Sequence, residues 1–262
     1  MTYNSDKNLE VTTVWSFPER GSWATHSSNF RGNFAPQIPR NIMEMFSQPG
    51  DYILDPMVGG GTTAIEAKML ARNILASDIN PNFINKVNNV MGFEGAKVYS
   101  DLKVADARCL SHIPNQSIDL VITHPPYLNI IKYSDGNIPE DLSNIGSLPK
   151  FTAQIRLVAK ELYRVLKGDK FCAVLIGDTR KGRHYVPLAF NVMLAFLKED
   201  FILKEDIVKV QHNCKMTNRW GWKAKRDKFY LIMHEHLFVF RKPRADENIS
   251  RLKQSTKNIY QQ

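Results

Sequence analysis

The feature that most constrains the fold is a short apolar segment that runs into three consecutive glycines at positions 59–61. Residues 52–54 have the length and composition of a buried strand, and Thr62 and Thr63 stand where a helix would begin. Such a turn lets a ligand approach backbone that carries no side chains, at the carboxyl edge of a sheet. The segment therefore predicts a strand, a turn that can hold a ligand, and a helix. A tight turn without a ligand is the alternative.

Two later segments favour the interpretation with a ligand. The apolar run 74–77 ends at Asp78, from which a carboxylate could hold a pair of ribose hydroxyls. A buried strand predicted at 117–123 delivers the sequence Thr-His-Pro-Pro-Tyr, at 123–127, to the same edge of the sheet. Because tandem prolines remove two backbone donors and fix the chain, this run could point a carbonyl and a side chain at one small target.

These segments carry a family resemblance. Residues 55–63, Asp-Pro-Met-Val-Gly-Gly-Gly-Thr-Thr, resemble the cofactor motif of S-adenosylmethionine-dependent DNA amino-methyltransferases, and 124–127, His-Pro-Pro-Tyr, resemble their catalytic (Asp/Asn/Ser)-Pro-Pro-(Tyr/Phe) motif. The resemblance runs from about Trp15 to Pro243. The alternation of strands and helices predicts one doubly wound α/β domain over 1–262. The resemblance implies that this domain is Rossmann-like, with a seven-stranded, mostly parallel sheet and an antiparallel last strand.

The implied cofactor is S-adenosyl-L-methionine. Free backbone N–H groups at the helix start could bond its methionyl carboxylate. For Asp106 two interpretations stay open: a bond to the adenine amino group, which the resemblance implies, or an ion pair with Arg108. The cofactor-binding residues expected from the motif and the resemblance are Phe34, Pro36, Ile38, Asp55, Pro56, Gly59, Gly61, Thr62, Thr63, Asp78, Ile79, Asp106 and Ala107.

The predicted catalytic residues are His124, Pro125, Pro126 and Tyr127. An exocyclic amine needs acceptors for its hydrogens and a flat surface for the extruded base, and Tyr127 can supply the stacking surface. No strong general base is required, because a methyl sulfonium is already the activated reactant. A purely structural Pro-Pro turn is the alternative.

The charge balance predicts an anionic partner. The chain has 35 Lys+Arg against 26 Asp+Glu, a net charge of +9, which favours nucleic acid as the partner. The alternative is that the positive charge serves only to keep the protein soluble. Segments 128–148 and 211–228 are candidate DNA-recognition loops, and a solvated charged hairpin is the alternative for the second. The candidate nucleic-acid contacts are Arg20, Arg31, Lys132, Arg180, Lys181, Arg183, Lys215, Arg219, Trp220, Trp222, Lys223, Lys225 and Arg226.

Other patterns in the sequence concern the two termini, a possible metal site and the remaining helices and strands. Residues 1–10 and 244–262 are expected to be frayed, or in the second case a short exposed helix. His234 and His236 could share a metal, but Glu235 should point the opposite way, so no metal site is predicted. Helices are expected at 40–46, 64–71, 151–166 and 185–197, and another helix is expected to begin with a cap at Asn80-Pro81. Further strands are expected at 98–105, 171–178, 201–210 and 229–240, and a basic loop at 179–184.

Composition also bears on location. No apolar run is long enough to span a bilayer, and the polar N-terminus is no signal peptide. Three widely spaced cysteines, Cys109, Cys172 and Cys214, suggest free thiols in a reducing compartment. A cytoplasmic location without membrane contact is therefore expected.

The expected function is site-specific methylation of an exocyclic amine in double-stranded DNA, with the target base flipped out. Cytosine N4 is preferred over adenine N6, because Thr-His-Pro-Pro-Tyr looks like the Thr-Ser-Pro-Pro-Tyr form with histidine in place of serine. Methylation of an RNA base amine is a second hypothesis, although no appended RNA-binding domain is present. An inactive cofactor-binding, DNA-binding protein is a third. A separately encoded restriction endonuclease is a candidate partner.

Overall fold

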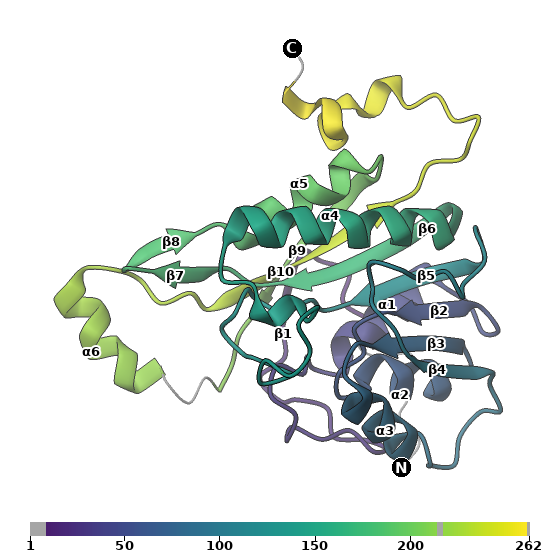
Figure 1. Cartoon of the computed structure of the whole chain (residues 1–262), viewed down its shortest axis with the longest axis horizontal. Helices are drawn as coiled ribbons and strands as arrows, with labels where there is room; N and C mark the ends of the chain where they lie inside the picture. The colour runs from purple at the N-terminus through teal and green to yellow at the C-terminus, as the bar shows by residue number, and fades with distance from the viewer. Residues whose placement is uncertain (1–8, 214–216, 261–262) are drawn as a thin grey trace.

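A central eight-stranded sheet organises the protein (Figure 1). The structure is a computed structural model that describes residues 9–213 and 217–260. In spatial order the strands run β1-β9-β10-β6-β5-β2-β3-β4. Their bounds are β1 (Val14–Ser16), β2 (Tyr52–Asp55), β3 (Asn73–Asp78), β4 (Ser100–Val104), β5 (Ile118–Thr123), β6 (Leu166–Ile176), β9 (Ile202–Val210) and β10 (His234–Arg241).

The predicted sheet is present, with one strand added. β10 runs antiparallel to both β6 and β9, whereas the other neighbouring strands pair in parallel. The eighth strand is β1, which pairs with β9, forms one edge of the sheet and buries Trp15. Three residues are too short for a periodic pattern, so this strand gave no signal in the sequence.

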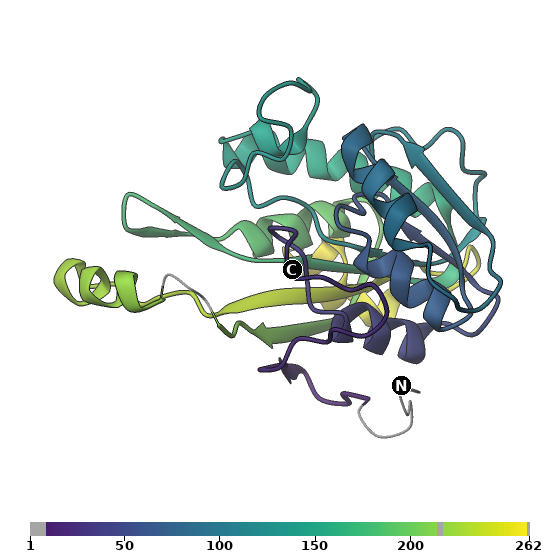
Figure 2. The same ribbon diagram turned by 90° about the horizontal axis from the view of Figure 1, so that it is seen from below.

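Helices cover both faces of the sheet, as Figures 1 and 2 show. α1, α2 and α3 supply Ile42, Ala64 and Val87 to the core on one face, and α4 and α5 supply Phe151 and Phe196 to the other. The helix bounds are α1 (Gln37–Phe46), α2 (Thr62–Met69), α3 (Pro81–Val90), α4 (Leu148–Val165), α5 (Leu188–Lys198) and α6 (Thr217–Asp227). None of the described helices combines the length and the apolar composition that a bilayer crossing needs.

The predicted start of α3 is confirmed. The side chain of Asn80 accepts a hydrogen bond from the backbone N–H of Asn82, and Pro81 occupies the first helical turn. Short 3₁₀ helices, η2 (Leu142–Asn144), η3 (Ser250–Ser255) and η4 (Lys257–Tyr260), complete the elements. The expectation of a frayed N-terminus falls largely on residues 1–8, which lie outside the described residues.

Segment 179–187 departs from the prediction of a basic loop followed by a helix from Tyr185. It forms a hairpin of β7 (Thr179–Lys181) and β8 (His184–Val186), in which Tyr185 pairs with Arg180. The turn consists of Gly182 and Arg183, with φ of 56° and 71°, the positive values that a tight two-residue hairpin turn requires. Helix α5 begins only after Pro187, at Leu188.

Segment 211–233 also differs from expectation. Residues 217–227 form helix α6 and not a loop or hairpin, and Trp220 and Ala224 are four residues apart on it, with Ala224 buried. β10 begins at His234, so the prediction that this strand begins at residue 229 is wrong. α6 and the β7–β8 hairpin extend from the same end of the sheet in both views (Figures 1 and 2).

Candidate active site

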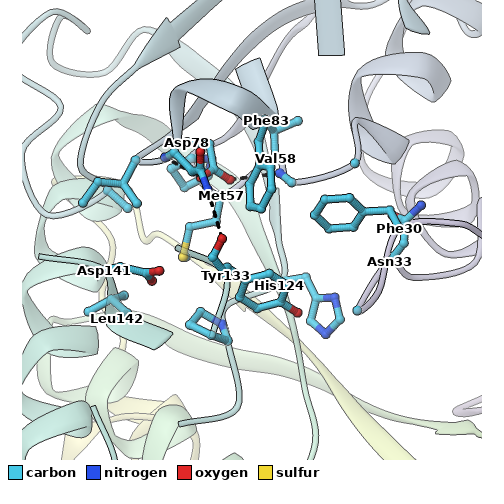
Figure 3. Close-up of a pocket in the computed structure, with 18 of the residues that line it drawn as sticks. Phe30, Asn33, Met57, Val58, Asp78, Phe83, His124, Tyr133, Asp141 and Leu142 are labelled. Carbon is cyan, nitrogen blue, oxygen red and sulfur yellow. Dashed lines mark hydrogen bonds between the residues drawn. The ribbon is translucent and has the colours of Figure 1, made fainter. Parts of the chain in front are cut away.

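Two cavities meet at the carboxyl edge of the parallel strands. The first cavity lies beside the glycine turn, with residues from the N-terminal segment and from 133–142 around it (Figure 3). The second cavity lies on the other side of the His-Pro-Pro-Tyr run. The residues that line both cavities are Gly32, Asn33, Phe34, His124 and Tyr133. His124 therefore stands where the two cavities join.

The glycine turn connects a strand and a helix, β2 and α2, as the sequence predicted. Gly59 and Gly61 have φ of 48° and 87°, and Gly61 is the residue before the first turn of α2. A Cβ atom added at Gly60 would lie 3.0 Å from Cγ of Phe30, whose ring packs over the turn. Phe30 and Asn33 are site residues that sequence reasoning missed, because the chain reversal that brings them to the turn leaves no local pattern.

Asp78 is held at the first cavity by backbone donors. Its Oδ2 accepts from the N–H of Gly59 at 3.0 Å, and its Oδ1 accepts from the N–H of Asn80 at 3.0 Å. Burial raises the pKa of Asp78 to about 6. Each carboxylate oxygen keeps a further lone pair, so Asp78 can still accept hydrogen bonds from a diol in the cavity.

Several predicted cofactor residues form the frame of the site. Among the described residues, Phe34, Pro56, Gly59, Asp78, Ile79, Asp106 and Ala107 line the first cavity, whereas Pro36, Ile38, Asp55, Gly61, Thr62 and Thr63 do not.

The contacts of these frame residues explain their positions. Asp55 accepts from the N–H of Met57 at 3.1 Å and from the hydroxyl of Thr63 at 2.6 Å, and its burial raises its pKa to about 7. Thr62 donates to the side chain of Asn33. Ile38 is packed in the core. These residues shape the turn from behind, and their contact with a cofactor stays a prediction.

Both interpretations of Asp106 have support in its surroundings. Nε of Arg108 donates to its two carboxylate oxygens at 2.9 and 3.0 Å, which is the predicted ion pair. Asp106 also lines the first cavity. The ion pair therefore fixes the carboxylate at the cavity wall without removing it from the site.

A chain of hydrogen bonds crosses the second cavity. Tyr127 Oη donates to Glu235 Oε1 at 2.6 Å, and Lys209 Nζ donates to Glu235 Oε2 at 2.9 Å. Tyr127 Oη also lies 2.7 Å from Nε2 of His124. Four side chains, two from the residues after β5 and one each from β9 and β10, are thus linked at one wall of the cavity.

Burial determines the charges in this chain of bonds. Burial lowers the pKa of His124 to about 4 and raises that of Tyr127, so both are neutral at pH 7. Burial also opposes the ionisation of Glu235, but the charge of Lys209 and the hydrogen bond from Tyr127 outweigh it and hold the pKa of Glu235 below its usual value. Glu235 is therefore an ionised, buried acceptor.

Glu235 and Lys209 are further site residues that sequence reasoning missed. The expectation that Glu235 points away from His234 and His236 agrees with its contacts, because alternate strand residues face opposite sides. What the sequence did not reveal is that β10 lies beside β6, which brings this side of β10 to Tyr127.

Segment 128–148 was predicted to be a DNA-recognition loop. Tyr133, Asp141 and Leu142 line the first cavity, and the carbonyl oxygen of Tyr133 accepts from Nδ2 of Asn80 at 3.0 Å. The middle of this segment therefore covers the first cavity, while Ile130 and Ile131 reach the second.

Some predicted nucleic-acid contacts have structural partners. Arg20 is half-buried and donates to the carbonyl oxygen of Asn33 at 3.2 Å, and burial lowers its pKa. Arg180 donates to the carbonyl oxygen of Tyr230 at 2.7 Å. Arg31, Lys132, Lys181 and Lys225 are exposed. Lys215 and the side chain of Arg219 lie outside the described residues.

The remaining basic residues gather between the β7–β8 hairpin and α6. A third cavity there is lined by Arg180, Arg183, Trp220 and Lys223 among others. The ammonium of Lys223 lies 4.6 Å from the ring centre of Trp220, and the guanidinium of Arg226 lies 4.6 Å from that of Trp222. We call this combination of hairpin and helix the basic end. Its cations lie against aromatic rings, and its contact with nucleic acid stays a prediction.

Comparison with known proteins identifies relatives of the chain. A family model described as DNA methylase matches residues 2–89 and 118–262. The Type II methyltransferase M1.MboII of Moraxella bovis is 42% identical over 83 residues, which are 30% of this chain and 32% of that protein. M.MjaI of Methanocaldococcus jannaschii, also a Type II methyltransferase, is 33% identical over 101 residues, 38% of this chain and 33% of that protein. The chain thus spans about a third of the length of these relatives.

Solved structures support the fold. A SAM-dependent methyltransferase from Methanosarcina mazei matches 77% of this chain and 97% of its own, with a TM-score of 0.54 at 14% identity. TrmN from Thermus thermophilus matches 81% of this chain and 50% of its own, with a TM-score of 0.52 at 17% identity. At these identities the similarity concerns the fold alone.

Proposed function

Because the chain belongs to the DNA methylase family, we propose that it transfers a methyl group from S-adenosyl-L-methionine to an exocyclic amine of a base in double-stranded DNA. The observation that carries this proposal is the junction of two cavities at His124. One cavity has a glycine turn and a carboxylate suited to a nucleoside. The other has an aromatic ring and acceptors suited to a base.

The residues of the first cavity fit the cofactor. Asp78 would bond the ribose hydroxyls, since it lines the cavity as an acceptor. The backbone of the glycine turn would lie against the methionyl part, and Ile79, Asp106 and Ala107 would surround the adenine. When bound, the cofactor supplies a methyl group that a sulfonium has already activated. The protein must then orient the nucleophile and exclude water.

The second cavity would receive the flipped base. Tyr127 would stack on it, and the carbonyl of Pro125 and the ring of His124 would accept the two amine hydrogens. With these hydrogens held, the nitrogen lone pair would face the first cavity. A bound cofactor would supply the methyl group there, and the methylated nitrogen would then release one proton to solvent.

This role places a condition on His124. A neutral imidazole has one acceptor nitrogen, so Nδ1 can accept only if the proton is on Nε2. The hydroxyl of Tyr127 donates its hydrogen bond to Glu235, which leaves a lone pair on Tyr127 Oη to accept from an Nε2–H group of His124. Glu235 and Lys209 would thus act as positioning residues for the catalytic pair.

Cytosine N4 is our preferred target, on the likeness of Thr-His-Pro-Pro-Tyr to the Thr-Ser-Pro-Pro-Tyr form, with adenine N6 as the alternative. The basic end would contact the phosphates next to the flipped base. A separately encoded restriction endonuclease is the partner that a site-specific enzyme of this kind would have. A DNA substrate also favours the cytoplasmic location expected from the sequence.

The test is methylation of mixed-sequence duplex DNA with isotope-labelled cofactor, followed by mass spectrometry of the nucleosides. Label in N4-methylcytosine is expected, with none when Tyr127→Ala replaces the wild type. Label in N6-methyladenine would reverse the preferred target, and label only in a parallel RNA sample would overturn the DNA proposal. Cofactor binding without transfer to any nucleic acid would support an inactive binding protein.

A further inference from the structure

Three side chains of metal-binding type converge on the side of β10 opposite to Glu235. Asp178 follows β6, and His234 and His236 are alternate residues of β10; one possible ligand atom of each lies within 4.8 Å of the others. The antiparallel register accounts for this, because His236 pairs with Ile176, and Asp178 and His234 each lie two residues beyond this pair on the same side. Asp178 could not be expected here from the sequence, since it joins the histidines only through the antiparallel pairing.

We propose that Asp178, His234 and His236 bind one divalent first-row metal ion. Two imidazoles and one carboxylate form a ligand set typical of zinc, with a fourth position left for water. Asp178 and His236 are buried and His234 is half-buried, so the site is enclosed on one side and open on the other.

The ring of His236 is oriented as a metal ligand requires. Its Nδ1 lies 2.9 Å from Oδ1 of Asp206, a contact that directs Nε2 towards Asp178. Nε2 lies 3.9 Å from Oδ2 of Asp178, which is too long for a hydrogen bond. Two ligands of a tetrahedral zinc ion with bonds of about 2.0–2.1 Å are roughly 3.3 Å apart, so only a small approach is needed.

Asp178 also has protein partners, which suggest a competing interpretation. Its Oδ1 accepts from the N–H of Ala189 at 2.8 Å, and its Oδ2 accepts from the hydroxyl of Tyr185. If the only role of Asp178 were to fix the start of α5, these two hydrogen bonds would be sufficient. These two bonds leave one lone pair on each oxygen, however, and do not account for the two histidines that each place a ring nitrogen within 4.8 Å of this carboxylate.

The position of the cluster indicates a structural role for the ion. Asp178 directly precedes the β7–β8 hairpin, and His234 follows the segment that leads back from α6. An ion held by both would join the roots of the two elements of the basic end. It would lie apart from the junction at His124, so methyl transfer does not pass through it.

The test uses the untagged full chain, stripped with a chelator and titrated with Zn²⁺ by calorimetry and with Co²⁺ by visible absorption. One ion per chain is expected. His234→Ala and His236→Gln should each weaken binding at least about tenfold, and Asp206→Asn, which acts through His236, about 10–100-fold. His112→Ala is the matched control, because His112 is exposed and outside the cluster. Circular dichroism confirms that each variant is folded.

Binding that is absent in the wild type, or that survives unchanged in folded His234→Ala, would overturn the site. Loss of binding in Cys109→Ser, which removes an exposed thiol, would likewise assign the ion to another place. Because the metal ion is the only probe, these outcomes do not depend on whether the chain methylates DNA.

Discussion

Replacing Tyr127 with phenylalanine removes one hydroxyl group and keeps the ring. The hydroxyl donates to Glu235 at 2.6 Å and meets Nε2 of His124 at 2.7 Å. The ring remains available for stacking. Tyr127→Phe therefore separates the hydrogen-bond role of this residue from its stacking role, whereas Tyr127→Ala removes both.

The structure allows the size of the effect to be worked out. The Glu235 side chain is 9% exposed, so its lost bond is a buried hydrogen bond to a charged group, worth about 1.5–3 kcal/mol of unfolding free energy. If the same loss frees the ring of His124 in the transition state, turnover falls roughly 10- to 150-fold. Tyr127→Ala should fall further, because base stacking contributes about 1–3 kcal/mol more.

Two measurements check this prediction: unfolding in urea, and single-turnover methylation of duplex DNA with labelled cofactor. Cofactor affinity should be nearly unchanged in both variants, because Tyr127 lines the second cavity and not the first. Tyr99→Phe is the matched control. Tyr99 is 54% exposed on a different strand edge, so its stability should change by less than about 0.5 kcal/mol.

The result that refutes the reasoning is a Tyr127→Phe variant with the stability of the wild type, since the bond to Glu235 would then contribute nothing. Equal turnover in Tyr127→Phe and Tyr127→Ala would refute the stacking role. Wild-type turnover in Tyr127→Ala would remove Tyr127 from the catalytic site altogether.

Three further predictions concern the cofactor, DNA and pH. Asp78→Asn should weaken S-adenosyl-L-methionine binding by about 1.5–3 kcal/mol in calorimetry, and an unchanged affinity would contradict the ribose assignment. The affinity of the wild type should also decline as the pH falls through about 6, the raised pKa of Asp78, because the carboxylate is then protonated. Replacing Lys223, Lys225 and Arg226 with alanine should flatten the dependence of log DNA affinity on log salt by roughly 0.9 per lost phosphate contact, and an unchanged slope would mean that they face away from DNA. Burial lowers the pKa of His124 from 6.5 to about 4. As the pH falls between these two values, His124 is protonated in the unfolded chain but stays neutral in the folded chain. Stability should therefore drop there, less so in His124→Asn, and the pH profile of turnover should show no histidine step near 6.5.

The parts of the site that the sequence predicted are those set by neighbouring residues. The glycine turn, Asp78 and the His-Pro-Pro-Tyr run each follow directly on a strand, and parallel strands bring their carboxyl ends to one edge. Their meeting at one place therefore follows from local patterns together with the fold class.

The parts that could not be predicted depend on contacts between distant segments. Tyr127 and Glu235 are 108 positions apart, and their contact requires the strand order, which no local pattern encodes. Phe30 reaches the glycine turn through an irregular segment. Helix α6 was missed for another reason: it is rich in Lys and Arg, and Trp220 and Ala224, four residues apart, form too weak an apolar pattern to predict a helix.

The alternation along β10 makes this strand sensitive to insertions and deletions. Glu235 contacts Tyr127 on one side, and His236 contacts Asp206 on the other, because successive residues face opposite sides. A single residue added near position 233 that shifted the strand would exchange the two sides and disrupt both clusters at once. An added residue in the exposed turn at Gly136, which has no side-chain neighbour, would leave both intact. In a scan of single-residue insertions, we therefore expect the start of β10 to be among the least tolerant positions of the chain.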